Sequence, residues 1–275
     1  MAHPQIAVFA RLAEGGKPPA RRIEGQQTLL GRASHAIVYN EIHDEIVVPQ
    51  GFAQAILTFR GAARGEEGPI RVIHGNRTQL RDPDPLAVDP VHNEIFVPED
   101  NRIMVFPREA NGNVAPIRVL RGADDVQFEF PGVLPAHNLL VVSAKAGQGQ
   151  NQLLIFDRLA QGNAKPLRVI GGPRTTLGDE LGELRAYRDW IVVAHEVNGR
   201  TPADPTRPAI SVWSIHDQGD VPPRWSMNLG LVDGLPVDLK GFDLDPKNRT
   251  IVVATGRKPN NAVLTYSFPE LFEGR

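Results

Sequence analysis

A phrase of about eleven residues recurs along the chain at intervals of about fifty residues. The copies that agree best are GEEGPIRVIHG (65–75), GNVAPIRVLRG (112–122) and GNAKPLRVIGG (162–172). Repeats with a period of about fifty residues are typical of modular folds, in which each module buries its apolar face against the next one. The chain is therefore expected to build one kind of unit several times.

Each unit also carries short apolar segments rich in β-branched residues and bounded by Gly, Pro, Asn or Asp, which predicts strands of four to six residues. One segment ends in an aromatic residue, and the next segment contains an arginine. The spacing between the two is the same in four copies and one residue shorter in the fifth, which predicts a constant hairpin. The aromatic residues are Phe9, Phe59, Phe106, Phe156, Trp213 and Tyr266, and the arginines are Arg21, Arg71, Arg118, Arg168 and Arg224.

Four short strands per unit without helical periodicity predict an all-β chain, a β-propeller of four-stranded antiparallel blades. We expect one propeller domain over residues 1–275. Five repeat units are recognised, and one strand, at 6–9 or 263–266, is left over. Three explanations remain open: a blade with an extra strand, an irregular sixth blade, or an end that pairs with another molecule.

The repeated arginines and aromatic residues are expected to be structural. A residue type that recurs in every unit suits pairing or packing between blades better than chemistry at one site. We therefore predict that the aromatic residues form the core between sheets and that function lies where the repeat breaks.

The segment PLAVDP…NEIFVPEDNRIMVF (85–106) resembles the repeat of NHL-type propellers, in which an inner strand ending in Val-Asp precedes a second strand and then Asn-Arg-Ile-x-Val-Phe. The other units match the hydrophobic skeleton of that repeat. The broader group includes gluconolactonase-like propellers, sensor domains, RNA-binding modules, calcium-dependent lactonases and lyases, so the resemblance implies a fold and not an activity. Most members have six blades, which implies six here.

Composition excludes several classes of partner. The formal net charge is −2 and no block of like charges occurs, which argues against nucleic acid and anionic membrane surfaces. The sequence contains no run of eighteen apolar residues, so membrane insertion is not predicted. The absence of cysteine excludes disulfides and thiolate chemistry. The compartment is not indicated: the cytoplasm is the default, and a removed signal peptide would instead imply the periplasm or secretion.

Inner strands line the channel of a propeller, so the residues that differ between units there are candidates for a site. Aligned on the second strands, the column that ends each inner strand is Asn40, Asp89, Leu134, Arg185 and Asp245, and the column two residues earlier is Val38, Ala87, Gly132, Glu183 and Asp243. Glu183, Asp243 and Asp245 predict oxygen ligands for a metal such as calcium, and Asn40, Asp89 and Arg185 a polar ligand site. The alternative is that Asp89-Pro90 and Asp245-Pro246 start turns and that Arg185 neutralises its acidic neighbours.

A second set lies where the chain enters each inner strand and predicts a rim that contacts ligand: His35, Asp84, Glu129, Glu180 and Lys240. The longest departures from the repeat, at 195–208 and 144–152, are expected on the same face, and His195 and Glu196 add candidates there. Ordinary solvated loops would show the same variety.

Three functions follow as hypotheses. The first is a non-catalytic binding or scaffold propeller that recognises a protein or small polar ligand through its loop face. The second is a calcium- or other metal-dependent hydrolase or lactonase. The third is a structural subunit that forms oligomers by adding its terminal strand to a neighbour. Motifs of nucleophilic serine hydrolases, phosphate loops and dinucleotide sites are absent from the sequence.

Overall fold

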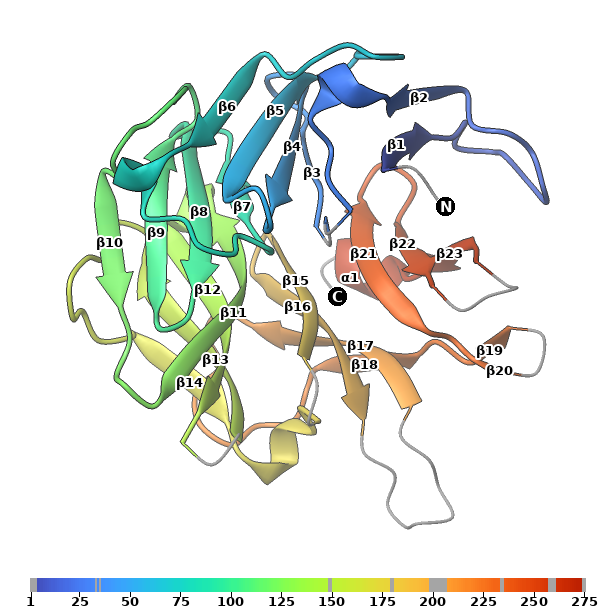
Figure 1. Cartoon of the computed structure of the whole chain (residues 1–275). Helices are drawn as coiled ribbons and strands as arrows, with labels where there is room; N and C mark the ends of the chain where they lie inside the picture. Colours follow the sequence, from blue (N-terminus) through green and yellow to red (C-terminus); the bar gives the residue numbers. More distant parts are fainter. Residues whose placement is uncertain are drawn as a thin grey trace. The chain divides into compact units, whose positions relative to one another are not determined.

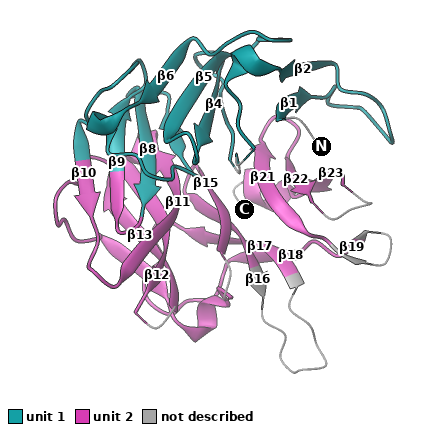
Figure 2. Ribbon diagram, viewed as in Figure 1, with its two compact units in different colours: residues 1–99, 104–118 teal, residues 100–103, 119–275 magenta. Residues whose placement is uncertain are grey.

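The computed structural model describes residues 4–32, 34, 36–147, 150–178, 181–197, 207–232, 235–256 and 261–273, with the backbone alone for 196, 197, 207, 232, 235 and 236. The chain divides into two compact units, residues 1–99 with 104–118 and residues 100–103 with 119–275 (Figure 2). Each unit is described by itself. The expectation of a single domain stays a prediction.

Most of the described chain is β-structure (Figure 1), and four sheets each contain four strands in chain order. These sheets are β3 (Val38–Asn40), β4 (Glu45–Gln50), β5 (Ala55–Arg60) and β6 (Arg71–His74); β7 (Ala87–Asp89), β8 (Glu94–Glu99), β9 (Arg102–Pro107) and β10 (Arg118–Arg121); β11 (Val126–Leu134), β12 (Leu139–Ala146), β13 (Gln150–Asp157) and β14 (Arg168–Gly171); and β15 (Leu181–Tyr187), β16 (Trp190–Val197), β17 (Arg207–Ser214) and β18 (Trp225–Asn228). Each has the inner, second, third and outer strand of one repeat unit, as the sequence predicts.

The other strands form smaller sheets. They are the pair β1 (Gln5–Val8) and β2 (Arg21–Glu24), the pair β19 (Leu231–Val232) and β20 (Leu235–Pro236), and the three-stranded sheet of β21 (Leu239–Asp245), β22 (Thr250–Thr255) and β23 (Val263–Ser267). The fold is a β-propeller with five blades, which confirms the fold class and corrects the six blades implied by the resemblance.

Short helical segments, which the repeat does not predict, are η1 (Gln26–Thr28), η2 (Asn76–Thr78), η3 (Pro135–His137), η4 (Pro173–Thr175) and α1 (Pro269–Glu273).

A parallel bridge joins each of four outer strands to a glycine of the following repeat unit. The pairs are Ile23 with Gly65, Ile73 with Gly112, Leu120 with Gly162, and Ile170 with Gly219. At Gly162 the amide donates to the Val119 carbonyl at 2.8 Å, and the Arg121 amide donates to the Gly162 carbonyl at 2.7 Å. All four glycines have positive φ, between 59° and 79°, where a side chain is unfavourable. The repeated phrase therefore begins with glycine because this residue joins consecutive units.

The aromatic residues that end the third strands form much of the core, with one exception. Phe59, Phe106, Phe156 and Trp213 are at most 2% exposed. Phe9 is 46% exposed, so the prediction that it belongs to the core is wrong. Phe9 follows the last residue of β1, which belongs to a sheet of only two strands. Tyr266 is half-buried, and its hydroxyl donates to the Leu229 carbonyl at 2.9 Å.

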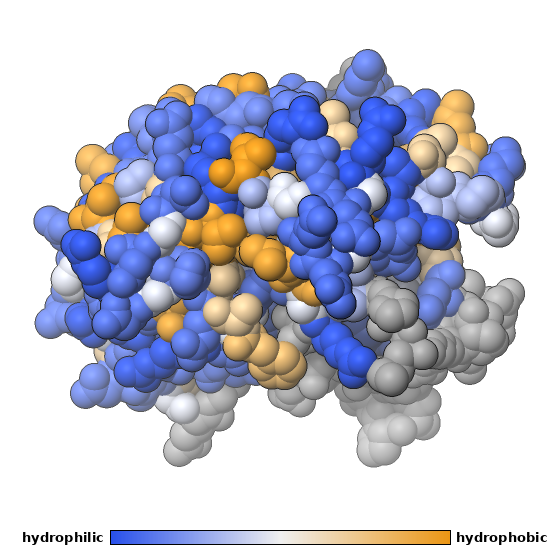
Figure 3. Space-filling view, turned by 45° about the horizontal axis from the view of Figure 1, so that its top comes forward, coloured by the Kyte–Doolittle hydropathy of each residue, from blue (hydrophilic) through white to orange (hydrophobic). Residues whose placement is uncertain are grey.

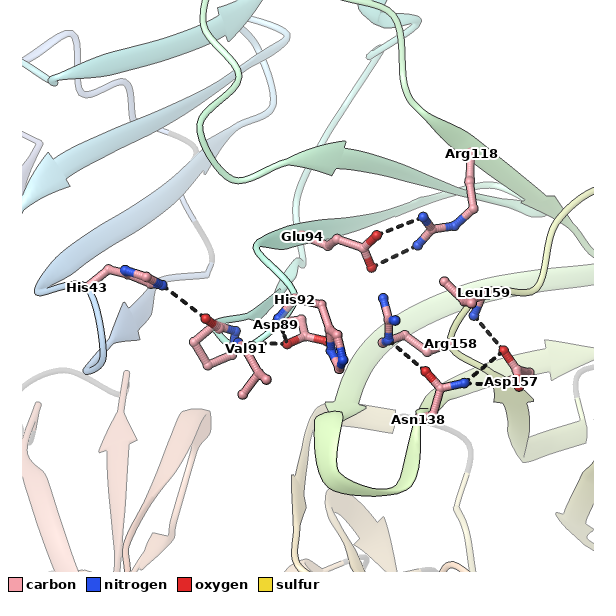
Figure 4. A network of polar contacts seen from close by, with 11 residues as sticks. His43, Asp89, Val91, His92, Glu94, Arg118, Asn138, Asp157, Arg158 and Leu159 are labelled. Carbon is pink, nitrogen blue, oxygen red and sulfur yellow. Dashed lines mark hydrogen bonds and ion pairs between the residues drawn. The ribbon is translucent and has the colours of Figure 1, made fainter.

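The repeated arginines make structural contacts, but the predicted pairing between blades holds for only two of the five. Arg118 donates to both carboxylate oxygens of Glu94 at 2.7 and 2.8 Å (Figure 4), a pair within one blade. Arg168 instead donates to the Ile215 carbonyl at 2.7 Å, in the following repeat unit. The remaining arginines follow one pattern or the other: Arg71 pairs with Glu45, Arg224 pairs with Asp217, and Arg21 bonds the carbonyls of Gly61 and Ala63.

Candidate functional site

Two inner strands, β15 and β21, bring three charged side chains together. Arg185 Nη2 lies 2.9 Å from Glu183 Oε2, and Arg185 Nε lies 3.1 Å from Asp243 Oδ1. The Phe242 amide also donates to Glu183 Oε2, at 3.1 Å. Two of the three residues were predicted as metal ligands and the third as a ligand-binding residue, and the structure places the guanidinium between the two carboxylates.

The pairing register explains why Arg185 faces Asp243. Arg185 is opposite Val192 and Asp243 is opposite Val252, so the two occupy equivalent rows of their blades. The alignment of the sequence places Arg185 with Asp245 instead, two residues further along the strand. The difference arises because only two residues connect Tyr187 to its partner Trp190, whereas four connect Asp245 to Thr250.

The pairing of β15 and of β21 with their neighbouring strands is irregular near the start of each strand. Register shifts lie between Leu181 and Leu184 on β15 and between Leu239 and Gly241 on β21. Bulges of this kind redirect side chains at functional sites. Gly241 allows the close approach of Glu183, because a Cβ there would lie 3.2 Å from Glu183 Oε1. The two bulges therefore let a charged side chain of one blade pack against the backbone of the next.

Burial differs across the cluster and sets its electrostatics. The side chains of Glu183 and Arg185 are 12% and 23% exposed, whereas that of Asp243 is 64% exposed. Burial raises the pKa of Glu183 above its ordinary value of 4.5, and the opposing influences are the charge of Arg185 and the Phe242 amide. The guanidinium carbon of Arg185 also lies 5.5 Å from the centre of the Phe242 ring. Arg185 is thus fixed from several sides.

The cluster retains capacity for hydrogen bonds. A guanidinium has five N–H donors, and Arg185 directs one to Asp243, one to Glu183 and one to the Leu184 carbonyl at 3.0 Å. Asp243 Oδ1 accepts from Arg185 and from the Leu244 amide at 2.9 Å, and the 64% exposure of the side chain makes its carboxylate accessible to solvent or a ligand. The site can therefore offer donors and an acceptor side by side.

Three other polar residues of the inner-strand columns stabilise turns, and for the two aspartates this is the alternative that the sequence left open. Asp89 is fully buried, and its Oδ1 accepts the amides of Val91 and His92, each at 2.9 Å (Figure 4). Asp245 Oδ1 accepts the Asn248 amide at 3.1 Å, and Asn40 Oδ1 accepts the His43 amide at 3.3 Å. These bonds close the connection between inner and second strands.

A metal centre is not assembled among the described residues, which contain no group of three or more His, Asp or Glu side chains placed to hold a metal ion. Glu183 and Asp243 share Arg185, and Asp245 Oδ2 accepts the Asn248 side-chain amide at 2.6 Å. The calcium ligand set Glu183, Asp243 and Asp245 therefore stays a prediction from sequence.

Three of the predicted rim residues are described. Glu129 Oε1 lies 3.0 Å from Lys145 Nζ, and Lys240 Nζ lies 2.9 Å from Asp238 Oδ1. Asp84 is half-buried. His35, Glu180, the side chain of Glu196 and most of the 195–208 loop lie outside the described residues, as do residues 148–149 of the 144–152 loop.

His195, another predicted ligand-binding residue, has a different neighbourhood from the one expected. Its Nε2 lies 2.8 Å from Ser211 Oγ, which in turn lies 2.9 Å from Ser226 Oγ. The imidazole ring centre is 5.9 Å from that of Trp213. This chain of one imidazole and two hydroxyl groups could not be predicted, because its members are on three different strands and only the pairing of those strands brings them together.

Comparisons with known proteins add no identity. No family model matches the chain, and no curated protein matches it. Within the described residues, no helix is long and apolar enough to span a membrane. Figure 3 shows a largely hydrophilic face with smaller hydrophobic patches.

Proposed function

We propose that the chain is a non-catalytic binding propeller of the NHL type that recognises a protein or small polar ligand. The observation that carries the proposal is the position of Arg185, held between Glu183 and Asp243 with hydrogen-bonding capacity remaining. The NHL assignment is supported by residues 85–106, whose matching segments form β7, β8 and all but the last residue of β9.

The charges of the cluster define the class of ligand. One guanidinium and two carboxylates sum to −1 when Glu183 is ionised, so a free anion is disfavoured. A neutral group that carries both an acceptor and a donor fits better, with the acceptor at Arg185 and the donor at Asp243. Sugar hydroxyls and peptide amides have this chemistry.

The two alternative functions make different demands on the same residues. A metal-dependent hydrolase needs a cation that displaces the guanidinium from Glu183 and Asp243 and recruits further oxygen ligands. A subunit that assembles by strand addition needs a free strand edge and does not depend on Asp243. Substitution of Asp243 therefore separates the three functions.

The test compares Asp243→Asn with Asp245→Asn, which lies on the same strand and whose carboxylate accepts the backbone and side-chain amides of Asn248 in a turn. Wild type and both variants are screened against an array of neutral glycans and a random peptide library, and hits are titrated by calorimetry. The proposal expects saturable ligands whose affinity falls at least about tenfold in Asp243→Asn and is retained in Asp245→Asn, as for loss of a charge-assisted bond.

A second titration, with calcium alone, distinguishes the metal-dependent hydrolase from the binding propeller. Saturable calcium binding that Asp243→Asn weakens would replace the binding proposal with the hydrolase. Ligands bound equally well by all three proteins would show that the cluster is not the site. Concentration-dependent assembly that is lost on deletion of residues 1–10 would favour the structural subunit.

A further inference from the structure

Three strands of one blade place an imidazole and two hydroxyl groups in a continuous chain. His195 is on β16, Ser211 on β17 and Ser226 on β18. The distances are 2.8 Å from His195 Nε2 to Ser211 Oγ and 2.9 Å from Ser211 Oγ to Ser226 Oγ. Both distances are in the normal range for hydrogen bonds to a hydroxyl group.

The chain leads from the interior of the blade to its surface. His195 is 2% exposed and Ser211 is fully buried, whereas Ser226 is exposed on the outer strand. Ser211 and Ser226 are direct cross-strand partners, so the antiparallel register of β17 and β18 fixes their contact. A reagent can reach Ser226, and a base inside the protein can receive its proton.

A serine hydroxyl is a weak nucleophile unless a base removes its proton. Here the base is connected to the exposed hydroxyl through one further hydroxyl. Activation requires the direction in which Ser226 donates to Ser211 and Ser211 donates to the unprotonated Nε2 of His195. The imidazole ring packs near Trp213, whose side chain is fully buried, so its position is constrained. This is the arrangement of nucleophile, relay and base, built on a rigid sheet instead of a loop.

We propose that Ser226 is an activated nucleophile and a site of covalent acylation or phosphorylation by small activated esters. The Ser226 oxygen forms the new bond to the carbonyl carbon or phosphorus, and the bond from that atom to its leaving group breaks. The Ser226 proton passes to Ser211 while the Ser211 proton passes to His195 Nε2. The imidazolium then returns its proton to the departing group or to water. This activity is independent of the ligand site at Arg185.

The test uses a fluorophosphonate probe on the full chain, with the labelled serine identified by mass spectrometry. The Ser226 oxygen forms a bond to phosphorus and fluoride leaves. The internal control is Ser267, which is exposed on β23 and lies outside the hydroxyl chain. Ser226 is expected to react at least about tenfold faster than Ser267, a modest part of what a positioned base provides.

Three variants test whether the faster labelling of Ser226 depends on Ser211 and His195. Ser211→Ala interrupts it and His195→Gln removes the base, and each is expected to reduce the Ser226 rate to that of Ser267. Ser211→Thr keeps the hydroxyl and is expected to retain most of the rate, which a purely structural role of residue 211 would not explain. If His195→Gln does not fold, the comparison of Ser211→Ala with Ser211→Thr decides. Equal labelling of Ser226 and Ser267 in the wild type, or labelling of Ser226 unchanged by Ser211→Ala, overturns the proposal.

Discussion

Glu45 holds two arginines at the start of a second strand, and its neutralisation should destabilise the protein strongly. Its Oε1 accepts Arg71 Nη2 and, at 2.7 Å, Arg108 Nη1. The side chain of Glu45 is 6% exposed, and those of Arg71 and Arg108 are 17% and 9% exposed. Glu45→Gln keeps the shape and one acceptor but leaves two largely buried cations without their shared counter-charge.

Removing one partner from a buried ion pair costs about 3–5 kcal/mol, and the retained acceptor places Glu45→Gln near 3 kcal/mol. For a chain of this size, that corresponds to a fall in Tm of about 6–12 °C. The measurement is thermal unfolding by circular dichroism, together with denaturant titration.

Glu109→Gln is the matched control because Glu109 contacts the same Arg108, at 3.0 Å, but is 76% exposed. An exposed pair contributes at most about 1 kcal/mol, so this variant should unfold close to the wild-type temperature. Equal shifts for the two variants would refute the argument that burial, and not pairing as such, determines the effect.

Two further predictions concern the core and the charged cluster. Phe156→Ala should lower the free energy of unfolding by about 3–5 kcal/mol, because Phe156 is 2% exposed. Phe9→Ala, at the equivalent repeat position but 46% exposed, should change it by less than about 1 kcal/mol in the same denaturant titration; similar losses would contradict the assignment of Phe9 to the surface. Glu183 has a raised pKa in the folded protein, so the folded state binds more protons than the unfolded state, and stability falls as pH rises from about 4.5 through the folded pKa. Glu183→Gln should lack this fall when unfolding is measured across that range, and an identical pH dependence in both proteins would count against the burial of Glu183 as its cause.

The repeat predicted the fold because it records local geometry. The strand segments, the Gly and Pro between them and the constant spacing from Phe106 to Arg118 all follow from hairpins of one length, and the structure confirms them. Helix α1 escaped prediction because five residues are too few to show helical periodicity. The prediction that Phe9 is buried was wrong because its position in the repeat does not show that its sheet has only two strands.

The candidate site was predicted only in part, for a specific reason. Glu183, Arg185 and Asp243 were singled out because they break the pattern of the repeat, and the structure brings them together. Their arrangement depends on a connection that is two residues shorter after Tyr187, which no alignment on the second strands can detect. Ser211 and Ser226 were missed because the candidates were sought on inner strands and in loops, whereas these serines are on a third and an outer strand. The register makes them direct partners and places Ser211 diagonally from His195.

The bridge between each of four outer strands and the glycine of the following unit has a consequence for how such a chain can change length. The same two backbone hydrogen bonds recur at Gly65, Gly112, Gly162 and Gly219, and they involve no side chain. A copied unit therefore carries both halves of its joint, an outer strand at one end and a glycine loop at the other. Duplication or removal of one whole unit would therefore present the same backbone donors and acceptors at each of these joints.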